Sequence, residues 1–89
     1  MNSKERAQLR AAANTIETIL QIGKGGIVEN VVTQVNDALE ARELIKGCVL
    51  ETGPLTAAEA ASVLAEKTNS EVIQVIGRRF VLYRKKKDK

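Results

Sequence analysis

Residues 19–26 place a lysine within a run of glycines, directly after an apolar stretch. They read Ile-Leu-Gln-Ile-Gly-Lys-Gly-Gly. Glycine adopts backbone angles that other residues avoid and lets a ligand come close to the main chain. If a helix begins just after this turn, its unpaired N–H groups and its dipole attract an anion, and Lys24 adds a positive charge. The pattern predicts a phosphate-binding turn, but a turn that needs glycine for its geometry alone matches the same spacing.

Basic residues gather in this turn and toward both ends of the sequence, whereas most acidic residues lie between them. The formal net charge of the 89 residues is only +3, so the distribution says more than the total. A basic perimeter favours a polyanionic partner. The candidate contacts are Gly23, Lys24, Gly25 and Gly26 in the turn, and Arg6, Arg10, Arg78, Arg79 and Arg84 outside it. The basic run 85–89, taken by itself, is better explained as a solubilising tail.

Residues for other kinds of chemistry are missing or wrongly spaced. The sequence has no histidine and one cysteine, Cys48, so no histidine base can activate the thiol and we expect it to be packed. No carboxylates cluster as acid–base or metal-binding groups do. A Walker-type phosphate loop fails because Thr18 stands where its first glycine belongs, and Gly25 where its Ser or Thr belongs. We therefore expect no enzyme activity, no cofactor and no metal.

Two common RNA-binding folds also fit poorly. Phe80 and Tyr83 are the only aromatic residues, too few for the stacking platform of an RNA-recognition motif. A Gly-x-x-Gly loop occurs in KH domains as well, but there it joins two helices. Here residues 18–22 precede the loop, and their β-branched side chains are typical of a strand.

The composition predicts one small globular domain. Hydrophobic residues make up 44% of the chain, and no apolar run approaches the ~20 residues of a membrane span. Residues 1–6 lead into no continuous apolar core, so we expect no signal peptide. A single cysteine cannot form an internal disulfide, which fits a cytoplasmic location. The domain is expected to span residues 1–84, followed by a basic tail at 85–89.

Hydrophobic periodicity and capping patterns predict three helices and four strands. The helices are expected at 3–14, 27–43 and 56–67, and the strands at 18–22, 44–50, 71–76 and 79–84. Ser3 is the expected cap of the first helix, and Thr56 with Glu59 forms a capping box for the third. Residues 52–54 predict a turn, and Gly77 followed by Arg78 suits a two-residue hairpin.

This order, α-β-α-β-α-β-β, predicts an α/β fold with a four-stranded mixed sheet and helices packed on it. Each strand-helix-strand unit should cross right-handedly and pair its two strands in parallel, and the last two strands should form an antiparallel hairpin. Two helices are expected against one face of the sheet. The place of the first helix stays open at this point.

Four blocks of sequence, in this order, resemble a known family. They are 9–10, 21–26, 38–46, and 75–79 running on to 81–84. Over roughly residues 4–85 the chain is similar to the YhbY-type single-domain members of the CRM family (chloroplast RNA splicing and ribosome maturation). The resemblance implies RNA binding, association with precursors of the large ribosomal subunit, and a fold similar to the C-terminal domain of the third bacterial translation initiation factor. It also implies that the Gly-x-x-Gly loop, here Gly23, Lys24, Gly25 and Gly26, contacts RNA.

The sequence departs from this family pattern at two places. Relatives often carry histidines, a lysine and a proline between positions 13 and 18, where this chain has Asn14, Thr15, Ile16 and Glu17. The change is expected to remove positive charge from beside the glycine turn. Relatives also often have a Ser or Thr at position 28, so Val28 is expected to leave the second helix without a side-chain cap. A bound phosphate would then supply the missing acceptor.

These observations predict a non-enzymatic RNA-binding protein that assists assembly of the large ribosomal subunit. Lys24 and the glycine amides would hold backbone phosphate of ribosomal RNA, and the arginines would extend the contact. We expect a cytoplasmic monomer with no membrane or DNA partner. The alternative is a ribosome-associated adapter for protein interactions, whose basic tail only aids attraction to RNA. Nucleotide-dependent catalysis is a third interpretation.

Overall fold

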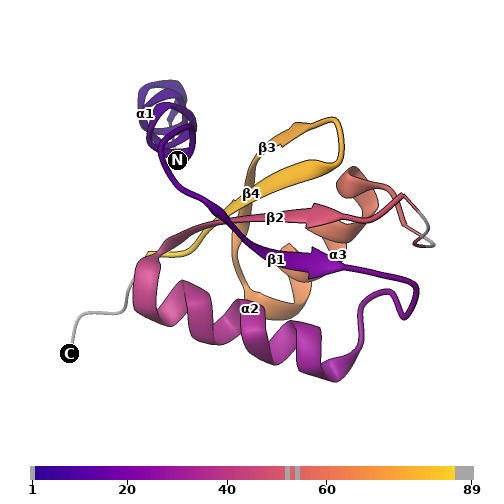
Figure 1. The fold of residues 1–89 in the computed structure, drawn as a ribbon. Coiled ribbons are helices and arrows are strands. Elements are labelled where there is room, and N and C mark those ends of the chain that lie inside the picture. The colour runs from indigo at the N-terminus through magenta and orange to yellow at the C-terminus, as the bar shows by residue number, and fades with distance from the viewer. Residues whose placement is uncertain (1, 52, 54, 86–89) are drawn as a thin grey trace.

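The computed structural model describes residues 2–51, 53 and 55–85, and it confirms the predicted order of elements (Figure 1). The helices and strands are α1 (Ser3–Ala13), β1 (Thr18–Ile22), α2 (Glu29–Arg42), β2 (Leu44–Val49), α3 (Ala57–Thr68), β3 (Glu71–Ile76) and β4 (Arg79–Tyr83). The expected bounds agree with these to within two residues. Part of the turn predicted at 52–54 lies outside the described residues.

The four strands form one mixed sheet in the order β1-β2-β4-β3. β1 pairs with β2 in parallel, and β4 pairs antiparallel with both β2 and β3. The prediction that the second and third strands pair in parallel is therefore wrong, because β4 lies between them. Phe80, Val81 and Leu82 are all buried, whereas Val75 and Ile76 near the end of β3 are exposed. A strand with apolar residues on both faces belongs in the middle of a sheet covered on both sides.

The sheet carries helices on both faces, and this settles the place of α1. On one face, α2 and α3 cover the larger core, which includes Phe80 and Leu82. On the other face, Leu9 and Ala13 of α1 pack against Ile73 and Val81. Figure 1 shows α1 at the end of the sheet opposite the turn of the β3–β4 hairpin, so it covers only part of its face.

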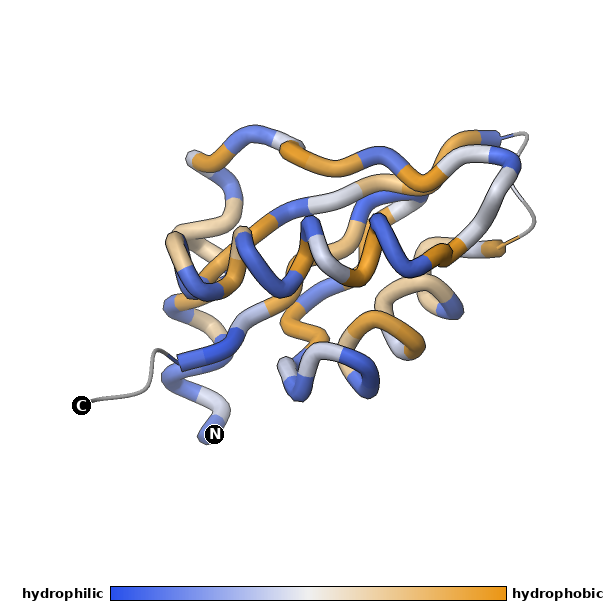
Figure 2. The backbone as a smooth tube through the Cα atoms, turned by 90° about the horizontal axis from the view of Figure 1, so that it is seen from below, coloured by the Kyte–Doolittle hydropathy of each residue, from blue (hydrophilic) through white to orange (hydrophobic). Residues whose placement is uncertain are grey.

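The helix α2 contains residues of low helix propensity and is held in place by packing. Its valines have low helix propensity, but Val35 and Leu39 lie fully buried against the sheet. Figure 2 shows hydrophilic and hydrophobic segments alternating along this helix, as expected when one side faces the core and the other faces water. Burial of that side compensates for the weak local preference.

The N-terminal caps of the helices match the sequence-based expectations except at α1. Asn2 caps α1, because its Oδ1 accepts from the backbone N–H of Glu5 at 2.8 Å, so the prediction of Ser3 as the cap is wrong by one residue. Asn2 has the extended backbone that a cap requires, and Ser3 is already helical. The capping box of Thr56 and Glu59 is present, and Val28 has no side-chain cap, both as predicted.

Candidate nucleic-acid interface

The glycine turn between β1 and α2 is a tight loop with its lysine at the tip. The N–H of Gly26 donates to the carbonyl of Gly23 at 3.0 Å, which leaves Lys24 and Gly25 exposed between them. Gly26 is buried and has φ 67°, a conformation that favours glycine. A Cβ added at Gly25 would meet no atom within 4 Å. The glycine required for geometry is thus Gly26, and the tip is open to a ligand.

The turn leads directly into the uncapped start of α2. The carbonyl of Val28 accepts from the N–H groups of Val31 and Val32, and no side chain caps the helix. The first N–H groups of a helix have no partner within it, and the dipole there favours a negative charge. Glu29 lies in this first turn and supplies one carboxylate nearby. The arrangement can accept an anion but also carries a competing acidic group.

Two further loops lie beside the glycine turn. The N–H of Leu50 donates to Ile22 at 2.8 Å, and a Cβ at Gly53 would come within 3.0 Å of the carbonyl oxygen of Gly23. The N–H of Val49 donates to the carbonyl of Arg78 at 2.8 Å, which ties the β3–β4 hairpin to the end of β2. These loops therefore gather where β1, β2 and β3 end (Figure 1). We call this end, with Gly23–Gly26, Arg78 and Arg79, the glycine-turn end.

The two arginines at the glycine-turn end are open to solvent. The side chain of Arg78 is 60% exposed and forms an ion pair with Glu51 at 3.3 Å, whose carboxylate is more exposed still. Such surface pairs contribute about 0–1 kcal/mol and are readily exchanged. Arg79 is also exposed and forms no ion pair within the described part of the chain. Both guanidinium groups are accessible to a phosphate.

Arg84 lies at the opposite end of the sheet, and both of its Nη groups donate hydrogen bonds within the protein. Its Nη1 donates to Asn36 Oδ1 and to the carbonyl of Thr68, both at 2.7 Å. Its Nη2 donates to the carbonyl of Asn36 at 3.1 Å and to Glu40 Oε1 at 3.2 Å. The side chain is only 18% exposed. Arg84 therefore links α2 to the end of α3 instead of presenting a free cation.

The two candidate arginines of α1 also lie away from the glycine turn. Arg6 Nη1 donates to the carbonyl of Val72 at 2.7 Å, and Nη2 lies 3.6 Å from a carboxylate oxygen of Glu71. These contacts fasten α1 to the start of β3. Arg10 is exposed on α1, with no hydrogen bond or ion pair to another described residue outside its own helix. The structure brings neither arginine to the glycine-turn end.

The segment 14–17 does not lie beside the glycine turn, so that expectation is wrong. It precedes β1, whereas the turn follows β1, and the five residues of this strand separate the two by roughly 16 Å. A strand carries its flanking segments to opposite ends of a sheet. The substitutions at 14–17 therefore remove positive charge from the α1 end of the molecule and not from the glycine turn.

Lys46 was not predicted as a site residue from the sequence. It lies within β2, where burial alternates so that Ile45, Gly47 and Val49 face the larger core and Lys46 faces the α1 side. Arg79 and Val81 of β4 are on that same side of the sheet. Alternation along 44–49 was the signal that could have identified Lys46, because a period of two assigns a lysine to the outer face of a half-buried strand.

The described residues offer no group of three or more His, Cys, Asp or Glu side chains that could hold a metal ion. Over the same residues, no helix is long and apolar enough to cross a membrane. What the geometry does bring together is a glycine turn, an uncapped helix start and two accessible arginines. This combination can bind phosphate groups.

Comparisons with known proteins agree with this chemistry. The model of the CRS1/YhbY (CRM) domain matches residues 1–84. A Bacillus subtilis protein named "Probable RNA-binding protein YqeI" is 38% identical over 88 residues, which cover 99% of this chain and 92% of that protein. A Haemophilus influenzae protein named "RNA-binding protein" is 27% identical over 84 residues, with 94% and 85% covered. The solution structure of a hypothetical Staphylococcus aureus protein, described as a candidate RNA-binding protein, has a TM-score of 0.81 and 46% identity, with 99% and 92% covered.

Proposed function

This chain belongs to the CRS1/YhbY (CRM) domain family, and on that premise we propose that it binds RNA through the glycine-turn end and catalyses no reaction. The relatives named as RNA-binding proteins support the choice of partner. The observation that carries the proposal is the exposed tip of Lys24 and Gly25 directly before the uncapped start of α2.

In this proposal the glycine turn holds backbone phosphate. Lys24 supplies the charge, and main-chain N–H groups of the turn and of the helix start supply donors. Arg78 and Arg79 extend the contact along the same end of the sheet, and Arg10 adds a peripheral charge. The main-chain amides of the turn and Lys24 are proposed to contact phosphates and not base edges. Specificity therefore comes from the shape of the RNA, so that paired RNA with bulges or junctions competes well whatever its sequence.

The RNA we propose is ribosomal RNA in precursors of the large subunit, where the protein assists assembly as a cytoplasmic monomer. This target rests on the family resemblance, not on geometry. Crosslinking the protein to RNA in cells and sequencing the attached fragments tests it. Fragments that cluster in large-subunit precursor RNA support the proposal, and fragments spread over messenger and transfer RNA contradict it.

The contact itself is tested by replacing Lys24 and Gly25 together with aspartate. The open space at Gly25 accommodates the new side chain, and Gly25 is not among the glycines with positive φ, so the variant should stay folded. Losing one charge-assisted contact and adding two negative charges should weaken RNA binding by at least about thirtyfold, or ~2 kcal/mol. The measurement is an RNA titration, with a melting curve to verify folding.

A matched control places the same charge change on the exposed side of α1. Lys4→Asp with Gln8→Asp alters the net charge by the same amount, and both positions are exposed. This control should weaken binding far less, since α1 lies at the other end of the sheet. If the folded Lys24→Asp, Gly25→Asp variant binds RNA like the wild type while deletion of residues 85–89 abolishes binding, the tail and not the glycine turn is the RNA-binding site.

Salt dependence gives an independent measure of the contact. If the glycine-turn end and its neighbours neutralise ~3–6 phosphates, the logarithm of the affinity should fall against the logarithm of the salt concentration with a slope of roughly −2 to −5. Only two aromatic residues are available for salt-independent stacking. An affinity that stays constant from low to physiological salt would exclude a phosphate contact of this size.

A further inference from the structure

A shallow groove lies on the sheet face that α1 covers only in part. Its lining residues come from the end of α1 and from three strands, and its volume is about 140 Å³. They are Asn14, Lys46, Gln74, Ile76, Arg79 and Val81. The groove begins where the packing of α1 ends, because Val81 is the one lining residue that also belongs to the small core under α1.

Two cations on neighbouring strands meet in this groove. In the antiparallel pairing of β2 with β4, Lys46 is opposite Val81 and Arg79 is opposite Cys48. Lys46 and Arg79 are therefore diagonal neighbours on one face, with main chains about 7–8 Å apart. Neither side chain forms an ion pair among the described residues. Two like charges placed so close, without a carboxylate, favour binding of an anion between them.

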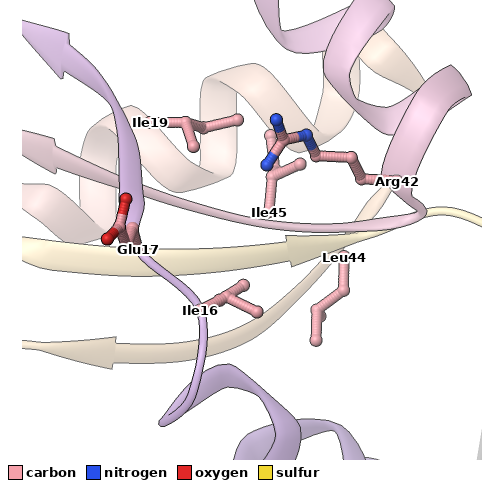
Figure 3. Close-up of a pocket in the computed structure, with 6 residues that line it drawn as sticks. All are labelled: Ile16, Glu17, Ile19, Arg42, Leu44 and Ile45. Carbon is pink, nitrogen blue, oxygen red and sulfur yellow. The ribbon is translucent and has the colours of Figure 1, made fainter.

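The charge of this groove differs from that of three other hollows on the molecule. The hollow of about 390 Å³ in Figure 3 contains Arg42 but also Glu17. A hollow at the glycine-turn end holds Arg78 with Glu51, and one beside the start of α2 holds Lys67 with Glu29. None of the residues that line the Lys46–Arg79 groove is acidic. In each of these three hollows the lining includes a cation and a carboxylate, whereas the described lining of the Lys46–Arg79 groove includes cations alone.

We propose that the Lys46–Arg79 groove binds a second segment of the RNA backbone, and this inference rests on the function proposed above. The ammonium group of Lys46 and the guanidinium of Arg79 neutralise phosphate. The side-chain amides of Asn14 and Gln74 donate to phosphate oxygens or exchange hydrogen bonds with the ribose 2′-hydroxyl. Ile76, which is 62% exposed, offers an apolar contact to the sugar.

Continuity with the glycine-turn end favours RNA over an acidic protein as the occupant. Arg79 follows Arg78 of the hairpin directly, so one strand of RNA can pass from the hairpin onto the open sheet face. The groove also lacks the aromatic side chains that anchor most protein interfaces. Polar amides beside paired cations suit the repeating phosphate and hydroxyl groups of a nucleic-acid backbone.

The test compares two double variants with equal loss of charge. Lys46→Gln with Arg79→Gln removes the groove cations, and Arg42→Gln with Lys67→Gln removes two cations that have acidic neighbours. RNA affinity of the groove variant at physiological salt should fall at least tenfold. The salt slope should become shallower by roughly 1.4–1.8, the value for two lost phosphate contacts. The control variant should stay within threefold of the wild type. Melting curves verify folding.

A measurement on the unaltered protein guards against misfolding of the variant, since Lys46 is half-buried. Bound RNA should protect the amine of Lys46 from acylation and leave the amine of Lys67 reactive. Wild-type affinity and salt slope in the groove variant, or an unprotected Lys46, would overturn the inference. If the Lys24→Asp, Gly25→Asp variant still loses binding in that case, the proposed function stands without the groove. Protection of Lys46 by an acidic protein and not by RNA would assign the groove to a protein partner.

Discussion

Arg84 at one end of the sheet and Arg78 at the other differ in what their guanidinium groups contact. Arg84 donates four hydrogen bonds to α2 and α3 and is 18% exposed. Arg78 has one ion pair with an exposed glutamate and is 60% exposed. An arginine whose N–H donors already have partners gains little from a phosphate, because the new bonds replace old ones. Arg84 is therefore a cation that holds the fold together, whereas Arg78 is a cation that is free to bind phosphate.

Replacing Arg84 with alanine gives the largest effect that we expect from this comparison. Truncation removes charge-assisted hydrogen bonds and leaves the carbonyl of Thr68 without this donor, so the free energy of unfolding should fall by about 2–3 kcal/mol. Urea denaturation measures the change. RNA affinity of the folded variant should stay within threefold of the wild type. Normal stability combined with weakened RNA binding would reverse the roles assigned to the two ends.

Replacing Arg6 with alanine should act in the same way but less strongly. This side chain makes one hydrogen bond to Val72 and a long ion pair with Glu71, and it is 38% exposed. We expect a loss of about 1 kcal/mol in the free energy of unfolding, because one charged hydrogen bond between α1 and β3 is removed. Arg10→Ala is the matched control on the same helix and should change stability by less than about 0.5 kcal/mol.

Replacing Arg78 with alanine should have the opposite pattern. Stability should change by less than about 0.5 kcal/mol, since the side chain is exposed and its ion pair is at the surface. RNA affinity should fall about threefold to fivefold, or ~0.6–1 kcal/mol, with a shallower salt slope. Titrations at low and physiological salt measure both quantities. A purely structural role for Arg78 would appear as lower stability with unchanged binding.

Replacing Glu51 with glutamine is the mildest test and should strengthen binding. The change frees Arg78 from its ion pair and removes a negative charge from the glycine-turn end. We expect RNA affinity to rise about twofold at low salt and the gain to vanish at high salt, because the charge is screened. Glu66→Gln, on the exposed side of α3, provides the control. Equal gains in both variants would show that only net charge matters.

The elements and the glycine turn were predictable because their causes are local. The capping box of Thr56 and Glu59 joins residues three positions apart, and the hairpin follows from a glycine that accepts positive φ at Gly77. Burial within β1 and β2 follows the alternation in their sequences. The RNA-binding role of the glycine turn is still a proposal, but its exposed position between strand and helix was expected from the sequence.

Strand order and the place of α1 required the whole structure. A parallel pairing of β2 with β3 satisfies the local rules as well as the observed order does, but it leaves Phe80, Val81 and Leu82 in an edge strand. Placing β4 in the centre buries these residues under helices on both faces. It also sets the ring of Phe80 over Gly47, where a Cβ would come within 2.6 Å of Cζ. Such contacts join residues far apart in sequence, which no local pattern reveals.

For the cations, too, some properties follow from the sequence and others follow only from the tertiary structure. The sequence by itself determined which residues are basic, the turn that carries Lys24, and the helix that follows it. Only the tertiary structure decided which arginines are free, because hydrogen-bond partners depend on contacts between distant segments. Arg84 donates hydrogen bonds to Asn36, 48 positions away in the sequence, and to Thr68, 16 positions away. Arg6 donates to Val72, 66 positions away. In the folded protein the N–H donors of Arg84 and Arg6 are already hydrogen-bonded. The N–H donors of Arg79 and Lys46 stay accessible on the open face of the sheet.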